Sequence, residues 1–302
     1  MKNKYTVLSL FDGMSCGQVA LGEAGIKVKK YYASEIDKSA ITITQKNHPN
    51  TIQLGSVVDL KKKQLRKLFK GKRVVLMGGS PCQGFSLAGK MLGASTSCGI
   101  DVTSLKQYLK LKKEGFAFDG QSYLFWEYVR IMRIVKPEFF FLENVRVTKK
   151  WLPMFNKAMG VSEVMINSAL MTPQNRERYY WTNIPFELPH DEHLYIDDFL
   201  QIKGVRVGQP QAHPRNYLEL GLPRKERMEF RTDRKSNTLL PSPLKNQIET
   251  PDGLRVLTVS ECERLQTLPL NYTNGVSKTQ RYKMIGSGWT VKVISHIFKG
   301  LK

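Results

Sequence analysis

The stretch that decides the fold is Tyr5-Thr-Val-Leu-Ser-Leu-Phe11, which Asp12-Gly13 follows directly. An apolar run of this length that ends in a turn-forming pair is typical of a buried β-strand. A helical pattern follows, and short apolar runs recur at 31–33, 51–54 and 74–77. Strands that alternate with helices predict an α/β fold with a parallel, doubly wound sheet. Further elements are predicted as helices over 36–47, 60–70 and 123–135, a strand over 139–142 and a strand pair around 162–181.

Polar side chains follow four of the predicted strands. Asp12, Glu35, Ser56 and Cys82 each come just after a strand. Ligands of doubly wound sheets bind beyond the carboxyl ends of the strands. We therefore expect these four residues to line one site.

The charge balance indicates a polyanionic partner. The chain has 47 Lys and Arg residues against 26 Asp and Glu, a formal net charge of +21. Nucleic acid is the commonest partner of such a protein, although solvated lysines are the alternative. The run 61–73 holds eight basic residues and no acidic one, and we interpret it as a solvated helix face. No apolar run approaches the length of a membrane helix and no signal peptide is recognised at 1–5, so we expect a cytoplasmic protein.

The cysteines and histidines give no pattern of a metal site. Cys16, Cys82, Cys98 and Cys262 are scattered and form no CxxC pair. This spacing argues against a structural zinc site and against a disulfide framework. The stretch His190-Asp-Glu-His193 lies among prolines without other ligands nearby, so we expect no metal there.

The glycine turn 11–17, Phe-Asp-Gly-Met-Ser-Cys-Gly, follows the first strand. Glycines let the backbone approach a cofactor, and the next helix offers free amides. The turn lacks the GxGxxG pattern, which disfavours a nicotinamide-dependent dehydrogenase. Glu35, at the end of the second strand, suits ribose hydroxyls, although a solvated carboxylate is the alternative. Together they indicate a cofactor that contains adenosine.

Cys82 is the candidate nucleophile. It follows Pro81 in a turn after a strand, and a helix start would favour its reactive thiolate. The alternative is an inert buried cysteine. Glu143-Asn144 brings a carboxyl group to the same edge, where it can donate a proton to a ring nitrogen. A salt-bridge partner is the alternative for Glu143.

Two arginines follow in Gln174-Asn-Arg176-Glu-Arg178. On a strand, side chains two residues apart point to the same face. Guanidinium groups suit a carbonyl or phosphate oxygen, and a surface charge pair is the alternative.

These motifs, in this order, resemble those of the DNA cytosine-5 methyltransferases. The resemblance is carried by Phe11-Asp-Gly13, Ser80-Pro-Cys-Gln-Gly-Phe-Ser86, Glu143-Asn-Val145, Gln174-x-Arg-x-Arg178, 231–239 and 286–291, and so covers almost the whole chain. Four stretches are especially similar in sequence to the animal de novo branch, namely Ser9–Gly13, Ala33–Glu35, Gly78–Cys82 and Gly286–Trp289. We expect a phage or bacterial member, active in the cytoplasm of a bacterial cell, in a restriction–modification context.

The resemblance implies S-adenosylmethionine as methyl donor and duplex DNA as partner, and it leaves the oligomeric state open. Cys82 would attack carbon 6 of a cytosine flipped out of the duplex, so that carbon 5 accepts the methyl group. Glu143 would protonate or hydrogen-bond ring nitrogen 3, and Arg178 would contact the cytosine carbonyl oxygen. Asn144 would support its loop, while Arg176 and Gln174 would hold the site.

The implied cofactor-binding residues are Phe11, Asp12, Gly13, Ser15, Gly17, Glu35, Ile36, Ser56, Val57, Pro81, Ser287 and Trp289. The implied DNA-binding residues are Gln83, Ser86, Arg231, Arg234, Ser236 and Asn237. Ser56 stands where the family often has an acidic residue, and Ser287 where it usually has asparagine.

The expected architecture is a Rossmann-like S-adenosylmethionine-dependent methyltransferase fold in 1–181 plus 256–302. A small, irregular target-recognition domain is expected over 182–255, where periodicity fades and eight of the fourteen prolines fall. It would close a cleft for duplex DNA. The spacing from Cys82 to Glu143, 143 − 82 = 61 residues, predicts an insert, which we place in a mobile segment at 90–122.

The C-terminal region is expected to be helical. Ser260 and Glu263 form a capping-box pattern, Ser277 is a candidate cap, and Gly286 is expected to end a helix.

Two other functions stay open at this point. A branch of the same family methylates transfer RNA, so an RNA cytosine-5 methyltransferase is one alternative. A non-catalytic DNA-binding relative is another, and the intact Cys82, Glu143 and Arg178 argue against it.

Overall fold

The computed structural model describes residues 4–81, 95–202, 205–211, 227–243 and 246–302. The chain divides into two compact units. Unit 1 comprises Met1–Ile166, Glu177–Leu188 and Ile294–Lys302, and unit 2 comprises Asn167–Arg176 and Pro189–Val293. Residues 256–293 thus group with unit 2, whereas the predicted division by function assigns them to the cofactor-binding domain. That functional division stays a prediction.

A seven-stranded sheet with the order β3-β2-β1-β4-β5-β7-β6 forms the centre of unit 1. Its strands are β1 (Tyr5–Leu10), β2 (Val28–Ser34), β3 (Ile52–Gln53), β4 (Val74–Gly78), β5 (Phe139–Asn144), β6 (Val164–Asn167) and β7 (Glu177–Thr182). β1 pairs in parallel with β2 and β4, and β4 pairs in parallel with β5. The predicted α/β fold with a largely parallel sheet is confirmed. The antiparallel pairing of β7 with β5 was not predicted.

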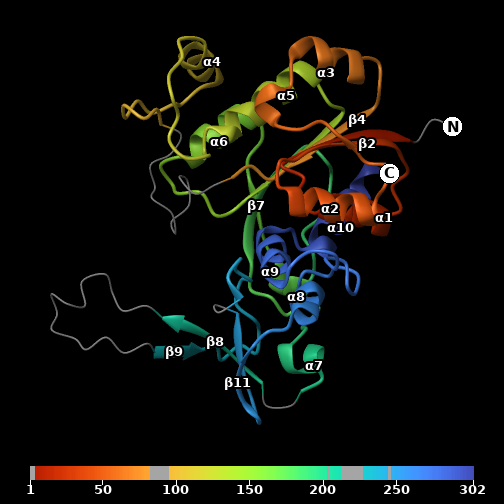
Figure 1. Ribbon diagram of the computed structural model, residues 1–302, viewed down its shortest axis with the longest axis vertical. Coiled ribbons are helices and arrows are strands. Elements are labelled where there is room, and N and C mark those ends of the chain that lie inside the picture. Colours follow the sequence, from red (N-terminus) through yellow and green to blue (C-terminus); the bar gives the residue numbers. More distant parts are fainter. Residues whose placement is uncertain (1–3, 82–94, 203–204, 212–226, 244–245) are drawn as a thin grey trace. The chain divides into compact units, whose positions relative to one another are not determined.

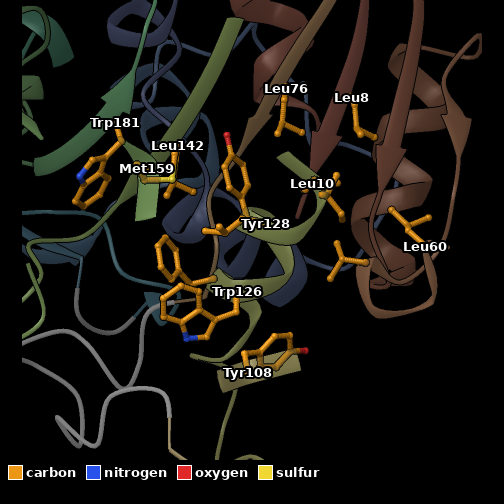
Figure 2. Packing of buried hydrophobic residues seen from close by; sticks show 14 of the residues in the cluster. Leu8, Leu10, Leu60, Leu76, Tyr108, Trp126, Tyr128, Leu142, Met159 and Trp181 are labelled. Carbon is orange, nitrogen blue, oxygen red and sulfur yellow. The ribbon is translucent and has the colours of Figure 1, made fainter. Parts of the chain in front are cut away.

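Helices cover both faces of this sheet. Unit 1 contains α1 (Cys16–Glu23), α2 (Lys38–Asn47), α3 (Lys62–Phe69), α4 (Leu105–Lys113), α5 (Leu124–Val135) and α6 (Leu152–Met159). In Figure 1, α1 and α2 lie on one side of the sheet, and α3, α5 and α6 lie on the other. All six residues of β1 are therefore buried. Figure 2 shows Leu10, Leu76 and Tyr128 within a cluster of buried apolar residues.

The basic run 61–73 lies largely on the surface. Helix α3 buries Leu65 and Phe69, while the charged residues of the run are exposed. This confirms the prediction of a solvated helix face.

The described part of the segment that was predicted to be mobile, residues 95–122, contains regular structure. Within its described residues it contains helix α4, which buries Tyr108 and Leu111. Ser104 caps the helix by accepting a hydrogen bond from the amide of Gln107. The prediction failed because two apolar side chains, three residues apart, are enough to dock a short lysine-rich helix.

Unit 2 contains a four-stranded sheet with the order β11-β10-β8-β9. The elements of unit 2 are α7 (Ile196–Leu200), β8 (Arg206–Gln211), β9 (Arg227–Phe230), β10 (Gln247–Thr250), β11 (Gly253–Val256), α8 (Val259–Leu265) and α9 (Lys278–Ser287). Helix α10 (Val291–Phe298) begins in unit 2 and ends in unit 1. The strands have four to six residues. The sequence analysis missed these strands because long segments separate them, so that hydrophobic periodicity could not be followed through the region that was predicted to be irregular.

The helix caps of unit 2 correct two predictions. The capping box of α8 consists of Thr258 and Glu261, so the Ser260–Glu263 prediction was wrong by two residues. Ser277 caps α9, as predicted, but α9 continues through Gly286. A Cβ atom at Gly286 would lie 2.5 Å from the backbone of Leu240. The glycine therefore permits close packing inside the helix and does not end it.

No helix in the described parts of the chain is long and apolar enough to span a membrane.

A glycine in β4 is expected to be essential for packing. A Cβ atom at Gly78 would lie 2.8 Å from the carbonyl oxygen of Leu10 and 3.2 Å from the ring of Tyr128. We expect Gly78→Ala to lower the free energy of unfolding by about 2 kcal/mol, measured by urea denaturation. The matched control is Gly22→Ala in helix α1, where a Cβ atom meets nothing within 4 Å. The control should be neutral or stabilising by up to about 1 kcal/mol, and equal losses in both variants would contradict the packing argument.

Candidate active site

Asp12 lies at the carboxyl end of β1 in a turn with unusual backbone angles. The φ angles of Phe11 and Ser15 are 56° and 62°, a region that residues with a Cβ rarely adopt. One carboxylate oxygen of Asp12 accepts a 2.6 Å hydrogen bond from the hydroxyl of Tyr31, and the other accepts one from the hydroxyl of Ser15. Burial raises the pKa of Asp12 to about 6 in spite of these hydrogen bonds, which lower it.

Glu35 joins the ends of β1 and β2. Its Oε2 accepts a hydrogen bond from the amide of Gly13 at 2.7 Å. Its Oε1 accepts from the amides of Ile36 and Asp37 at 2.7 and 2.8 Å. The side chain of Ile36 is 69% exposed, so an apolar surface stands beside the anchored carboxylate.

The 55–60 turn follows β3 and carries the third predicted strand-end residue, Ser56. The Ser34 hydroxyl donates to the carbonyl oxygen of Gly55 and so ties this turn to the end of β2. Ser56 accepts a hydrogen bond from the amide of Val58 and caps the short helix η1 (Val57–Asp59). The structure therefore brings Asp12, Glu35 and Ser56 to the same edge of the sheet, as predicted.

Asn144 connects the ends of β4 and β5. Its amide nitrogen lies 3.3 Å from both the carbonyl oxygen and the hydroxyl of Ser80. Its side-chain oxygen accepts a 2.8 Å hydrogen bond from the amide of Val145. Asn144 thus fixes the chain immediately before Pro81. Cys82, Gln83 and Ser86 lie outside the described residues.

Glu143 and Arg178 form an ion pair from the neighbouring strands β5 and β7. The Nε atom of Arg178 lies 3.0 Å from Oε1 of Glu143, and their side chains are only 13% and 11% exposed. The Nη1 group of Arg178 donates to the carbonyl oxygen of Glu177 at 2.7 Å. Nη2 has no partner among the described residues, so one donor face of this guanidinium is left for another acceptor.

Arg176 has a different environment from Arg178. It precedes β7 and belongs to unit 2. Its guanidinium donates to the carbonyl oxygens of Leu239, Gly286 and Gly288 at 3.4, 3.2 and 2.7 Å. The expectation that both arginines share one strand face was wrong, because the strand begins between them. Gln174 is also buried in unit 2, where it donates to the carbonyl oxygen of Leu265.

Some of the other predicted site residues in unit 2 already form hydrogen bonds or ion pairs. Arg231 pairs with Asp233, and Arg234 donates to Asp197 from Nε at 3.1 Å. Asn237 accepts a 3.4 Å hydrogen bond from Arg231. Trp289 is half-buried and Ser287 is exposed.

Ser236 is buried, and its backbone bonds to Pro173 and Asn175. Ser236 therefore lies inside unit 2, and its role as a DNA-contacting residue stays a prediction.

Three site residues were missed by the sequence analysis. Tyr31, which holds Asp12, sits in an apolar strand where nothing marks its hydroxyl as functional. Ser34 and Ser80 hold the ends of strands, and their positions at predicted strand ends are a signal that could have found them.

No group of three His, Cys, Asp or Glu residues that could hold a metal ion occurs in the described ranges. In the stretch 190–193, Glu192 is instead paired with Lys292 at 2.5 Å.

Comparison with known proteins identifies a family for this chain. The family model of C-5 cytosine-specific DNA methylases matches residues 5–204 and 216–302. The orphan methyltransferase M.SPRI of Bacillus phage SPR is 30% identical over 207 residues, which cover 64% of this chain and 41% of that protein. The type II methyltransferase M.Eco47II of Escherichia coli is 26% identical over 352 aligned residues, covering 96% of this chain and 77% of that protein. The chain thus spans less than half the length of the phage relative.

A similar fold is found in the crystal structure of a protein described as a DNA modification methyltransferase encoded within an E. coli prophage. That structure has a TM-score of 0.65 and 19% identity, and the match covers 99% of this chain and 98% of the other.

The raised pKa of Asp12 predicts a pH-dependent stability. The folded-state pKa of about 6 lies above the ordinary value of 3.8, so the folded protein binds the proton more tightly than the unfolded chain. The resulting stabilisation is complete below pH 3.8 and is lost as the pH rises through about 6. Its size is on the order of 3 kcal/mol, since the pKa of Asp12 rises by about 2. We expect Asp12→Asn to remove this component, measured by urea denaturation from pH 4 to 7. Identical pH slopes in the variant and the wild type would contradict it.

The environment of Arg176 predicts a structural role in unit 2. Arg176→Lys should lower the free energy of unfolding by about 2–3 kcal/mol, because an ammonium presents its donors from a single nitrogen, whereas two guanidinium nitrogens serve these carbonyl oxygens. The matched control is Arg206→Lys in β8, whose side chain is 58% exposed and pairs with Glu249. The control should change stability by less than about 1 kcal/mol in the same urea titration. A loss of similar size in both variants would argue against the buried cluster.

Proposed function

Because the chain belongs to the C-5 cytosine-specific DNA methylase family, we propose that it transfers a methyl group from S-adenosylmethionine to carbon 5 of a cytosine in duplex DNA. The observation that carries the proposal is the buried Glu143–Arg178 pair, next to the Asn144–Ser80 contact that fixes the approach to Cys82. This places a carboxyl group and a guanidinium donor at the strand edge that leads into the proposed nucleophile. The net charge of +21 suits the phosphates of the substrate.

The strand-end residues of unit 1 fit S-adenosylmethionine. A carboxylate offers about four acceptor positions, and the amides of Gly13, Ile36 and Asp37 occupy three on Glu35. The remaining position can accept a hydrogen bond from a ribose hydroxyl. The exposed Ile36 side chain offers an apolar surface to a flat purine ring. When bound, S-adenosylmethionine supplies an electrophilic methyl group.

Cys82 forms a bond from its thiolate sulfur to carbon 6 of the cytosine. The electron pair of the ring double bond moves toward nitrogen 3, where Glu143 donates a proton or a hydrogen bond. Arg178 directs its open Nη2 donor to the carbonyl oxygen, and Glu143 keeps this guanidinium in place. Carbon 5 then takes the methyl group. A base takes the proton from carbon 5, the sulfur leaves carbon 6 as a thiolate, and any proton gained by nitrogen 3 returns to Glu143, which restores the aromatic ring.

The cytosine must leave the base stack before Cys82 can reach it, which costs a few kcal/mol. We assign DNA contacts to Gln83, Ser86, Arg231, Arg234 and Asn237. Ion pairs with acidic neighbours hold Arg231 and Arg234, so each would exchange part of its pairing for phosphate or base contacts.

The proposed nucleophile can be tested by replacing two different cysteines. Cys82→Ala should abolish transfer of a labelled methyl group to unmethylated plasmid DNA, while binding of S-adenosylhomocysteine persists in calorimetry. Cys98→Ala, which removes an exposed thiol, is the matched control and should retain activity. Wild-type turnover in Cys82→Ala would refute the assignment.

A second measurement tests the covalent step and the substrate. A DNA duplex amplified with 5-fluorodeoxycytidine should become covalently attached to the wild-type protein in the presence of S-adenosylmethionine, because fluorine cannot leave as the proton does. Labelled methyl transfer to transfer RNA should stay at background. Absence of covalent trapping on the DNA together with background methyl transfer to RNA would exclude the mechanism, and methyl transfer to RNA alone would replace DNA as the proposed substrate.

A further inference from the structure

Helix α5 carries a fully buried carboxylate outside the proposed catalytic residues. The Glu127 side chain is 0% exposed in a largely apolar helix. Its Oε1 accepts hydrogen bonds from the hydroxyl of Tyr108 and from the ammonium group of Lys112, the latter at 2.6 Å. Its Oε2 accepts a 2.6 Å hydrogen bond from Nε of Arg130. A buried charge requires such partners, so their arrangement is specified tightly.

Arg130 extends this cluster to the 55–60 turn. Its Nη1 and Nη2 groups donate to the carbonyl oxygens of Leu60 and Val57 at 2.9 and 3.0 Å. The side chain of Arg130 is 14% exposed, and those of Val57 and Leu60 are buried. Ser34 holds the other end of the same turn through Gly55. The guanidinium therefore fixes the backbone on which the proposed cofactor contacts Ser56 and Val57 lie.

Helix α4 supplies the other half of the cluster, because Tyr108 and Lys112 are both on this helix. The segment around α4 is anchored by the indole of Trp126, which donates to the carbonyl oxygen of Val102 at 3.1 Å. The ring of Phe118 packs against that of Tyr108, with 5.0 Å between the ring centroids. Figure 2 shows Tyr108 next to Trp126 at one end of the apolar cluster that also contains Leu60.

We propose that Glu127 and Arg130 are positioning residues for the cofactor, and that helix α4 sets their position through Tyr108 and Lys112. The continuous path runs from the α4 side chains to the Glu127 carboxylate, then to the Arg130 guanidinium, and ends at the carbonyl oxygens of the 55–60 turn. The inference rests on the proposed function where it states that this turn holds S-adenosylmethionine. It assigns the insert between Cys82 and Glu143 a role in cofactor binding.

The link from α4 to the turn can be tested without any ligand. Hydrogen exchange of the full chain, followed by mass spectrometry, should show several-fold faster amide exchange over 55–60 in Arg130→Met and in Lys112→Met. Lys110→Met is the matched control, since Lys110 is on the same helix, is 74% exposed and loses the same charge. Lys112→Arg keeps a cation near Glu127 and should restore wild-type exchange. Unchanged exchange in Arg130→Met would overturn the clamp on the turn, and unchanged exchange in Lys112→Met would overturn the role of α4.

Cofactor affinity gives the second readout. The dissociation constant for S-adenosylmethionine should rise about tenfold in Arg130→Met and about threefold in Lys112→Met, and stay within about twofold in Lys110→Met and Lys112→Arg. In turnover assays the KM for S-adenosylmethionine should rise while kcat and the KM for DNA change by less than about twofold. A fall in kcat at unchanged cofactor KM would refute cofactor positioning. If the wild type binds no S-adenosylmethionine while exchange at 55–60 still responds to Lys112→Met, the proposed function fails and the mechanical link stands.

Discussion

Strand β1 is hydrogen-bonded on both edges, to β2 and to β4, and is buried along its whole length. Parallel pairing places the carboxyl ends of these strands at one edge of the sheet, and helices close both faces. The side chains that can leave the interior are therefore those that follow the strand ends. Asp12, Glu35 and Ser56 lie there, and Glu143 and Asn144 end the neighbouring strand β5. This constraint brings the polar side chains of unit 1 to one edge of the sheet. Local conformational preferences contribute little to that placement.

Two arginines at the start of β7 have different environments. Arg176 and Arg178 are two residues apart, yet one serves carbonyl oxygens of unit 2 and the other pairs with Glu143 in unit 1. The division between the units falls between them. Arg176 donates to three backbone carbonyl oxygens of unit 2, whereas Arg178 lies beside a buried carboxylate and has one donor face without a partner among the described residues. Residue type and spacing do not distinguish these two cases.

The sequence predicted the strands of unit 1 because buried parallel strands form continuous apolar runs with turn residues at their ends. It also predicted which polar residues share an edge, since that follows from the alternation alone. The hydroxyl of Tyr31 was missed because its partner, Asp12, is nineteen residues away in sequence. Helix α4 was missed because its lysines outweigh the two apolar side chains that dock it. Gly286 was wrongly predicted to end a helix. Its role is to allow close packing against the backbone of Leu240, a contact that only the tertiary structure reveals.

The buried carboxylate of Glu127 in α5 is a further feature whose role depends on tertiary contacts. A leucine in place of Glu127 would keep helix propensity, since both residues favour helices, but it would leave the Arg130 guanidinium without its carboxylate partner. Buried ion pairs often contribute little net stability, because desolvation offsets their attraction. Their benefit is geometric, since a cluster with several fixed donors tolerates few alternative arrangements. In this protein the fixed arrangement ends on the carbonyl oxygens of Val57 and Leu60, in the turn beside Glu35. An apolar core would pack the same helices together, but it would leave the register of that turn to a few weak contacts.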